Sequence, residues 1–182
     1  IPSIIRNDNC LYQGNLIDYF RAVFKHATNL DNPYHNFRHL CHVLWLCHRA
    51  CIFYSKNLTK REMRNLLIAA LFHDLDHTGK PGPDNNNVLR AILGLEKHLA
   101  SEDGLELTNI TELIKATEYP HTIHWSLLTL SGQILRDADL GQALNPAWIQ
   151  EVVFCLASEW RKQPIEVLRA QITFLGTLEF HT

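Results

Sequence analysis

The sequence predicts an all-α fold, a compact single-domain bundle of about seven to eight helices that takes in residues 1–182. Three observations favour this class. Apolar residues recur at intervals of three and four along most of the chain, which is the period of an amphipathic helix. Signals that start helices precede several of these stretches. No segment of useful length alternates apolar and polar residues as a strand does. A chain of 182 residues favours one domain and can bury a core without disulfides.

The first three expected helices each show a recognisable pattern. Residues 14–27 carry apolar side chains on a single face. Residues 32–54 begin with an asparagine suited to the cap and with Pro33 in the first turn. Residues 59–79 begin with a threonine that has Glu62 three positions later, which is a capping box, and they end at a glycine suited to a helix C-terminus.

The second half of the chain continues the helical pattern after one loop. The turn-forming sequence GKPGPDNNN predicts a loop over residues 79–87. Beyond it we expect helices over residues 87–101, 108–118, 124–144, 147–162 and 165–179.

Composition excludes several classes of function. The net charge is −2 and no basic run is present, so we expect no nucleic-acid partner. No apolar stretch reaches the ~20 residues of a membrane span, so we expect no membrane partner. Five cysteines form an odd set without paired spacing. We interpret them as small buried hydrophobic residues in a reducing compartment, which favours a cytoplasmic protein. The oligomeric state stays open.

Ionisable side chains interrupt the apolar stripe of the third expected helix. On a helix, His73, Asp74 and His77 would lie on the same face as Leu66. A buried carboxylate is costly unless it is paired or binds a metal. The plain alternative is a hydrogen-bonded histidine–aspartate pair or a helix end that has reached solvent. We expect Asp76 to face solvent.

Two further segments supply ligands of the same kind. His35 and His39 are four residues apart on the second expected helix, and an acidic cluster follows at residues 135–142. We interpret His42 and His48 as structural. Imidazoles together with carboxylates suit Zn²⁺, Fe²⁺, Mn²⁺ or Ni²⁺ better than Ca²⁺. Two carboxylates can also hold a second, harder ion such as Mg²⁺.

These segments resemble the HD superfamily of metal-dependent phosphohydrolases, and more closely its class I cyclic nucleotide phosphodiesterases. The sequence YHNFRH at 34–39 is similar to the family motif YHN-x-x-H, and AALFHDLDHTG at 69–79 is similar to AALFHDLDH-x-G. The family motif ADL resembles residues 138–140, and Q-x-x-F resembles residues 171–174. The resemblance runs in consistent order over residues 32–175.

The resemblance implies hydrolysis of a 3′,5′-cyclic nucleotide, a small-molecule substrate, to its 5′-monophosphate. It implies two divalent metal ions, Zn or Fe/Mn at the first site and Mg or Mn at the second. The implied metal ligands are His39, His73, Asp74 and Asp139.

The resemblance also assigns roles beside the metals. His35 gives a proton to the leaving group, and His77 orients the attacking water. Gln171 reads the purine and Phe174 stacks on it. Residues that support the ligands from behind are Asn36, Glu96 and Thr117.

The sequence departs from the family pattern at a few places, and two other functions stay open. The family has an asparagine where Gly82 stands, whereas three asparagines follow at residues 85–87. Gly141 and Gln142 follow the ADL sequence in place of serine and asparagine, and Glu118 replaces an aspartate. The alternatives are a hydrolase of the same fold that acts on another phosphate ester, such as a nucleotidase, and a catalytically silent nucleotide- or metal-binding module.

Overall fold

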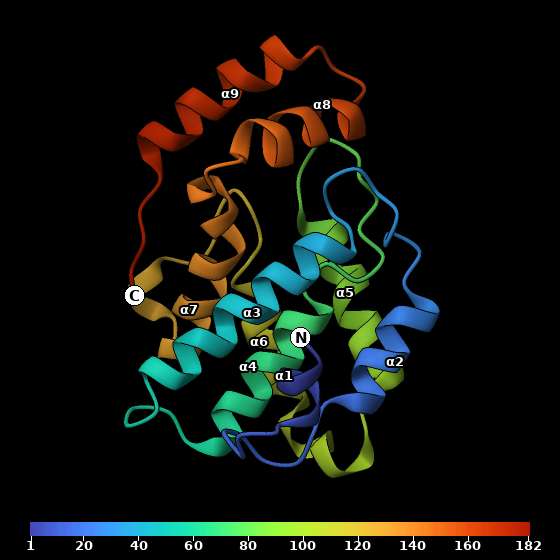
Figure 1. Cartoon of the computed structure of the whole chain (residues 1–182), viewed down its shortest axis with the longest axis vertical. Helices are drawn as coiled ribbons and strands as arrows, with labels where there is room; N and C mark the ends of the chain where they lie inside the picture. Colours follow the sequence, from blue (N-terminus) through green and yellow to red (C-terminus); the bar gives the residue numbers. More distant parts are fainter.

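The computed structural model describes all 182 residues, and it confirms the all-α fold (Figure 1). Short 3₁₀ and π-helical turns join nine α-helices, and there is no β-strand. The α-helices are α1 (Pro2–Arg6), α2 (Ile17–His26), α3 (Phe37–Phe53), α4 (Lys60–Phe72), α5 (Asn85–His98), α6 (Leu107–Lys115), α7 (Leu130–Leu140), α8 (Cys155–Trp160) and α9 (Pro164–Thr177).

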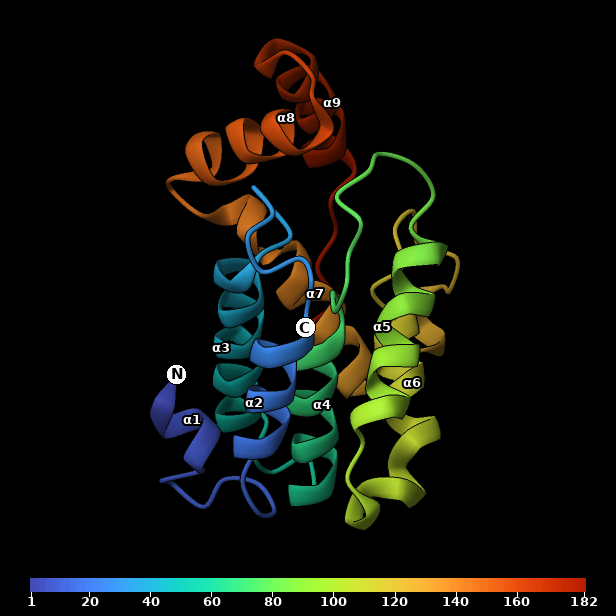
Figure 2. The same ribbon diagram turned by 90° about the vertical axis from the view of Figure 1, so that its right-hand side faces the viewer.

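Helix α4 is the centre of the fold. Every one of its residues from Met63 to Phe72 is buried. Helices α2, α3, α5, α6 and α7 all pack against it, and Figure 2 shows these helices standing side by side while α8 and α9 lie across their upper end. A single cluster of 31 buried apolar residues fills the space between them. The end of α4 that carries the predicted ligands therefore emerges from the core beneath α8 and α9.

A buried charged group ties α4 to the 3₁₀ segment η1 (Ser101–Glu106). Asp103 is fully buried, and its carboxylate accepts hydrogen bonds from Nε and Nη2 of Arg64, from Nη1 of Arg61 and from the hydroxyl of Tyr19, at 2.6–3.1 Å. Burial raises the pKa of Asp103, but the hydrogen bonds from Arg64 and Tyr19 outweigh it and hold the pKa below its ordinary value. A buried carboxylate is stable here because it is paired on all sides.

Several helix boundaries differ from the sequence-based expectation. Helix α3 begins at Phe37 and not at residue 32, because the side chain of Asn36 caps it by accepting from the backbone N–H groups of Arg38 and His39. Helix α4 ends at Phe72, and the expected helix did not continue to residue 79.

The expected helices near the C-terminal end are more divided than predicted. Residues 124–144 form a 3₁₀ turn, then α7 capped by Thr129, then another 3₁₀ turn. Residues 147–162 begin with the π-helical segment η4 (Ile149–Phe154) and continue as α8. Helix α1 and segment η1 were not predicted.

The cysteines are less uniformly buried than expected. Cys47 and Cys51 belong to the core, Cys41 and Cys155 are half-buried, and Cys10 is exposed, which contradicts the interpretation of all five as core residues. No helix combines the length and the apolar content that crossing a membrane requires.

Candidate metal centre and adjoining cavity

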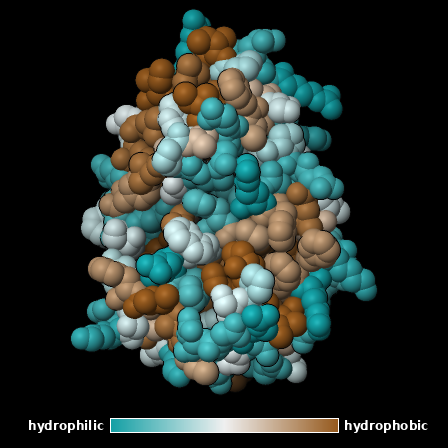
Figure 3. All heavy atoms as spheres, in the orientation of Figure 1, coloured by the Kyte–Doolittle hydropathy of each residue, from teal (hydrophilic) through white to brown (hydrophobic).

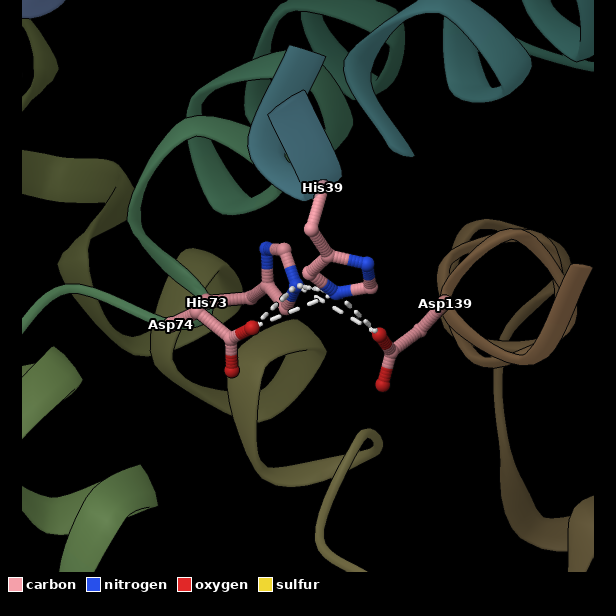
Figure 4. Close-up of side chains that lie close together, drawn as sticks. All are labelled: His39, His73, Asp74 and Asp139. Carbon is pink, nitrogen blue, oxygen red and sulfur yellow. Dashed lines mark hydrogen bonds and ion pairs between the residues drawn. The ribbon is translucent and has the colours of Figure 1, made fainter. Parts of the chain in front are cut away.

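Three elements bring the predicted metal ligands together (Figure 4). His39 lies in the first turn of α3, His73 and Asp74 directly follow α4, and Asp139 lies in the last turn of α7. Nε2 of His39 is 3.2 Å from Oδ2 of Asp74 and 3.0 Å from Oδ1 of Asp139. Nε2 of His73 is 3.4 Å and 3.5 Å from the same two oxygens. The four side chains thus point one ligand atom each at a common centre.

Hydrogen bonds behind the ring fix the tautomer of each histidine. Nδ1 of His39 donates to Oε1 of Gln142 at 2.9 Å, and Nδ1 of His73 donates to the carbonyl of Ala70 at 3.0 Å. A neutral imidazole that carries its proton on Nδ1 presents a lone pair on Nε2. Both Nε2 atoms are therefore prepared to bind a metal ion, since an oriented Nδ1–H is the usual support of a metal-binding histidine.

The residues present fit a divalent metal ion. Oδ2 of Asp74 is buried and has no hydrogen-bond partner, although unpaired buried carboxylate oxygens are costly. The Nε2 atoms of His39 and His73 lie 3.3 Å apart. Ligand atoms bound at about 2.0–2.2 Å to one ion are separated from each other by roughly 3.0–3.5 Å. A cation at the centre would satisfy the orphaned oxygen and the two facing lone pairs together.

The ionisation states of these side chains in the metal-free cluster also favour a bound cation. Burial raises the pKa of Asp74 and Asp139, but the neighbouring histidines outweigh it and hold both pKa values well below the usual range. Burial lowers the pKa of His39, but the hydrogen bond with Asp139 and the negative charges of Asp74 and Asp139 outweigh that effect and raise the pKa to about 9. Two ionised carboxylates therefore create a strongly negative centre that attracts either protons or a metal ion.

The turn after α4 has a shape that its sequence did not reveal. Asp76 adopts a left-handed conformation at φ 61° and its carboxylate accepts from the backbone and hydroxyl of Thr28. Asp76 is therefore half-buried and structural, which corrects the expectation that it faces solvent.

The side chain of Asn29 holds the turn from the other side. Its amide nitrogen donates to the carbonyls of His35 and Asp74, each at 2.9 Å, and its oxygen accepts from the backbone N–H of Asp76. Asn29 is buried. One amide therefore joins the segment that carries His35 to the turn that carries the metal ligands.

His35 and His77 form a second group beside the metal cluster. Nδ1 of His35 lies 2.5 Å from Oε1 of Glu159, whose other oxygen accepts from the backbone N–H groups of Tyr34 and His35. The rings of His35 and His77 stack with their centroids 3.5 Å apart. His77 has both nitrogens engaged, Nδ1 by the N–H of Gly79 and Nε2 by the side chain of Asn87. His35, His77 and Glu159 thus form a second group of side chains close enough together to hold an ion, next to the first.

A cavity of about 200 Å³ adjoins both groups. Its lining includes His35, Asp74 and Asp139 as well as Gln171 and Phe174 from α9. The structure therefore brings both residues of the predicted purine clamp to the cavity into which the metal cluster opens.

The three residues predicted to support the ligands differ in position. Asn36 caps α3 directly before His39, and Thr117 is buried in the cavity wall. Glu96 is exposed on α5 and does not line the cavity, because the phase of the helix turns Leu95 into the core and Glu96 outward. The predicted support of the metal ligands by Glu96 stays a prediction, and in this structure Glu96 has no contact with them through the cavity lining.

Four polar residues of the site were missed by sequence reasoning: Asn29, Asn87, Gln142 and Glu159. The sequence alone gives no role to any one of the asparagines at 85–87, and in the structure Asn87 is the partner of His77. In the sequence Gln142 is only a departure from the family pattern, and in the structure its side-chain oxygen accepts from Nδ1 of His39. Glu159 and Asn29 had no sequence signal, because their contacts join segments far apart in the chain.

Comparison with known proteins agrees with this geometry over part of the chain. Residues 34–89 match the family model described as 3′5′-cyclic nucleotide phosphodiesterase, which is less than a third of the 182 residues. No curated protein matches the chain significantly. The matched range includes His35, His39, His73, Asp74 and His77, whereas Asp139, Gln171 and Phe174 lie beyond it. Over the segment that carries three of the four predicted metal ligands, the chain thus matches the 3′5′-cyclic nucleotide phosphodiesterase family, as the sequence resemblance predicted.

Proposed function

We propose that this chain is a metal-dependent phosphodiesterase that hydrolyses a 3′,5′-cyclic nucleotide to the 5′-monophosphate. The observation that carries the proposal is the convergence of His39, His73, Asp74 and Asp139 on one point at the edge of a cavity. The family match over residues 34–89 supports the same reaction class.

The four ligands would hold the first ion, Zn or Fe/Mn, and Asp74 would share in holding a second, Mg or Mn. Bound ions of this kind neutralise charge on phosphoryl oxygens and make water a stronger nucleophile near neutral pH. The protein's own contribution is orientation, because Gln142 and the carbonyl of Ala70 fix the two imidazoles before the ion arrives.

His35 is the proposed proton donor to the leaving oxygen. Its Nδ1 is held by Glu159, which leaves Nε2 as the nitrogen available to a ligand in the cavity. Histidine suits this role at physiological pH. Burial raises the pKa of Glu159, but its hydrogen bonds with His35 and with the Tyr34 and His35 N–H groups hold it below the ordinary value, so Glu159 stays ionised beside the imidazole.

Gln171 and Phe174 are the proposed contacts of the nucleobase. Both line the cavity from α9, and the Phe174 ring packs edge-on against Tyr119 at 5.6 Å between centroids. A fixed aromatic ring suits stacking on a base, and an amide can donate to and accept from a purine edge.

The test is turnover by the purified protein with Mn²⁺ added. The panel contains cAMP, cGMP, a 2′,3′-cyclic nucleotide, a 5′-mononucleotide and bis(p-nitrophenyl) phosphate. Selective turnover of a 3′,5′-cyclic nucleotide that His35→Ala loses is the expected result. His48→Ala is the matched control, since His48 lies on the same helix as His39 but more than two turns further along α3. No turnover of any substrate by metal-loaded protein would overturn the proposal in favour of a binding module.

A second candidate is hydrolysis of another phosphate ester. The observation that favours it is the end of the family match at residue 89, before Gln171 and Phe174. Turnover of the 5′-mononucleotide alone would retain the metal centre and assign the protein to this class.

A further inference from the structure

Helix α9 is thinly attached to the rest of the molecule. Of its residues only Val167 is buried, and it belongs to a separate cluster of five apolar residues shared with η4 and α8. Ile165 and Ile172 are more than half exposed, and Figure 3 shows hydrophobic side chains at the surface of this upper end. Packing within this small cluster therefore holds only the first half of α9, while Gln171 and Phe174 lie in the second half.

The chain after α9 returns to the body of the fold. Residues 178–182, which we call the 178–182 strap, run down from α9 to α7 in both ribbon views (Figures 1 and 2). Oδ2 of Asp137 on α7 accepts from the backbone N–H groups of His181 and Thr182, both at 2.8 Å, and from the Thr182 hydroxyl at 2.6 Å.

A second contact secures the same strap. The imidazole of His181 stacks on the indole of Trp125, with the centroids 4.6 Å apart and the planes 10° from parallel. Asp137 itself is 7% exposed, so its carboxylate is directed at the strap and not at solvent. Buried carboxylates need partners, and the strap provides all three hydrogen bonds that Oδ2 receives.

We propose that the 178–182 strap, anchored on Asp137, fixes the second half of α9 over the cavity and thereby sets the affinity for the nucleobase. Asp137 is a positioning residue, because it acts through α9 and touches neither the metal ligands' centre nor the cavity lining. This inference rests on the proposed function for its ligand, the base of a nucleotide. It assigns Asp137, two residues before Asp139, a role separate from metal binding.

Three variants of the full chain, each loaded with Mn²⁺, test the inference. Thr182→Pro removes the backbone N–H and the hydroxyl of Thr182 without altering α7. Asp137→Ala removes the acceptor, and Asp137→Asn keeps an acceptor oxygen at the same place. Glu179→Gln is the matched control, because Glu179 is an exposed residue of the strap with no hydrogen bond from its side chain.

Two measurements are made on each variant. Hydrogen exchange followed by mass spectrometry reports how firmly α9 is held. Steady-state kinetics compares KM for the cyclic nucleotide with kcat for bis(p-nitrophenyl) phosphate, which has no nucleobase to engage α9. In Thr182→Pro and Asp137→Ala we expect faster exchange confined to α9 and a KM for the nucleotide raised roughly tenfold, the scale of one lost contact. Metal content and turnover of bis(p-nitrophenyl) phosphate stay unchanged, Asp137→Asn falls between, and Glu179→Gln matches the parent.

Three results would overturn the inference. Unchanged exchange in α9 would mean that the strap does not hold it. Faster exchange with an unchanged KM would mean that its position does not matter to the base. Loss of metal or of bis(p-nitrophenyl) phosphate turnover would show that Asp137 acts through Asp139. If the parent protein fails to turn over any cyclic nucleotide, the proposed function falls, while the exchange data still decide whether the strap holds α9.

Discussion

Nε2 of His39 and Nε2 of His73 face each other at 3.3 Å, while each Nδ1 donates to an oxygen behind its ring. Two lone pairs at this distance repel unless a proton or a metal ion lies between them, and the raised pKa of His39 means that protons compete for this position in the metal-free protein. The cluster is therefore built for an occupant, and most of its testable properties follow from that.

Removing a ligand should empty the centre. In His39→Ala or Asp74→Ala the remaining three groups hold the ion weakly, so we expect loss of both the bound metal and the turnover of any phosphate ester. Metal content by mass spectrometry after dialysis is the measurement. His48→Ala should retain both. A His39→Ala protein with full metal content would contradict the ligand assignment.

Metal affinity should rise with pH. In the metal-free protein Asp139 and Asp74 raise the pKa of His39 from its ordinary value to about 9, against the opposing effect of burial. The pKa of His73 is raised in the same way. While these imidazoles are protonated the ion must displace a proton, so the apparent affinity for Zn²⁺ increases with increasing pH, by about tenfold per pH unit for each displaced proton. Competition with a chromophoric chelator across this range measures the slope, and a flat profile would refute the proton competition.

Gln142 should matter to the metal without touching it. Gln142→Leu leaves Nδ1 of His39 without its acceptor, so the ring is free to carry its proton on Nε2. Losing such support typically weakens metal binding by about 10–100-fold. The same chelator competition at fixed pH reads the change. Gln142→Glu retains an acceptor and serves as the control, so equal weakening in both variants would point to a packing effect instead.

Glu159 should affect proton donation and leave the metal in place. Glu159→Gln keeps the volume but removes the charge that holds Nδ1 of His35, so we expect kcat to fall by roughly 10²-fold, a modest share of a general acid's contribution. Metal content should equal that of the parent. An unchanged kcat in this variant would contradict the role of Glu159 in orienting His35 for proton donation.

Asp103 should govern stability at the end of the fold away from the metal. Asp103→Ala leaves the buried Arg64 guanidinium without its closest carboxylate partner, and breaking a buried pair in this way costs about 3–5 kcal/mol of the free energy of unfolding. The pKa of Asp103 is lowered in the folded state. Its contribution is therefore fully present above its unfolded pKa of about 3.9 and is lost as pH falls through the lower folded value.

Urea unfolding of both proteins at neutral and acidic pH measures this effect. The gap between Asp103→Ala and the parent should narrow only under acid. Asp8→Ala removes an exposed ion pair with Arg6 and should not shift the unfolding midpoint. A constant gap at every pH would mean that packing, and not charge, accounts for the loss.

The sequence predicted the helical class and singled out the four side chains that converge in the cluster, because both depend on local signals. Helix period, capping residues and the compact motif at 73–77 are readable within a few positions. The helix ends were harder, because α4 stops at Phe72 through contacts that Asp76 makes with Thr28. Those two residues are 48 positions apart, and no short pattern records such a pairing.

The missed polar partners and the exposure of Glu96 share this cause. Glu96 sits in a segment that resembles the family pattern, yet the phase of α5 is set by Leu95 in the core. Glu159 reaches His35 across 124 positions, and Gln142 reaches His39 across 103. Partners of this kind depend on how the helices pack. The sequence therefore indicated the side chains of the cluster but not the residues that hydrogen-bond to them.

The amide of Asn29 carries a consequence for how the site fails. It donates hydrogen bonds to the carbonyls of both His35 and Asp74. The segment that carries the proposed acid and the turn that carries the predicted metal ligands therefore open and close as one cooperative unit. A state in which the metal is bound but His35 is out of position is thereby disfavoured. Local unfolding would abolish metal binding and proton donation in a single step, so the protein would lose function abruptly.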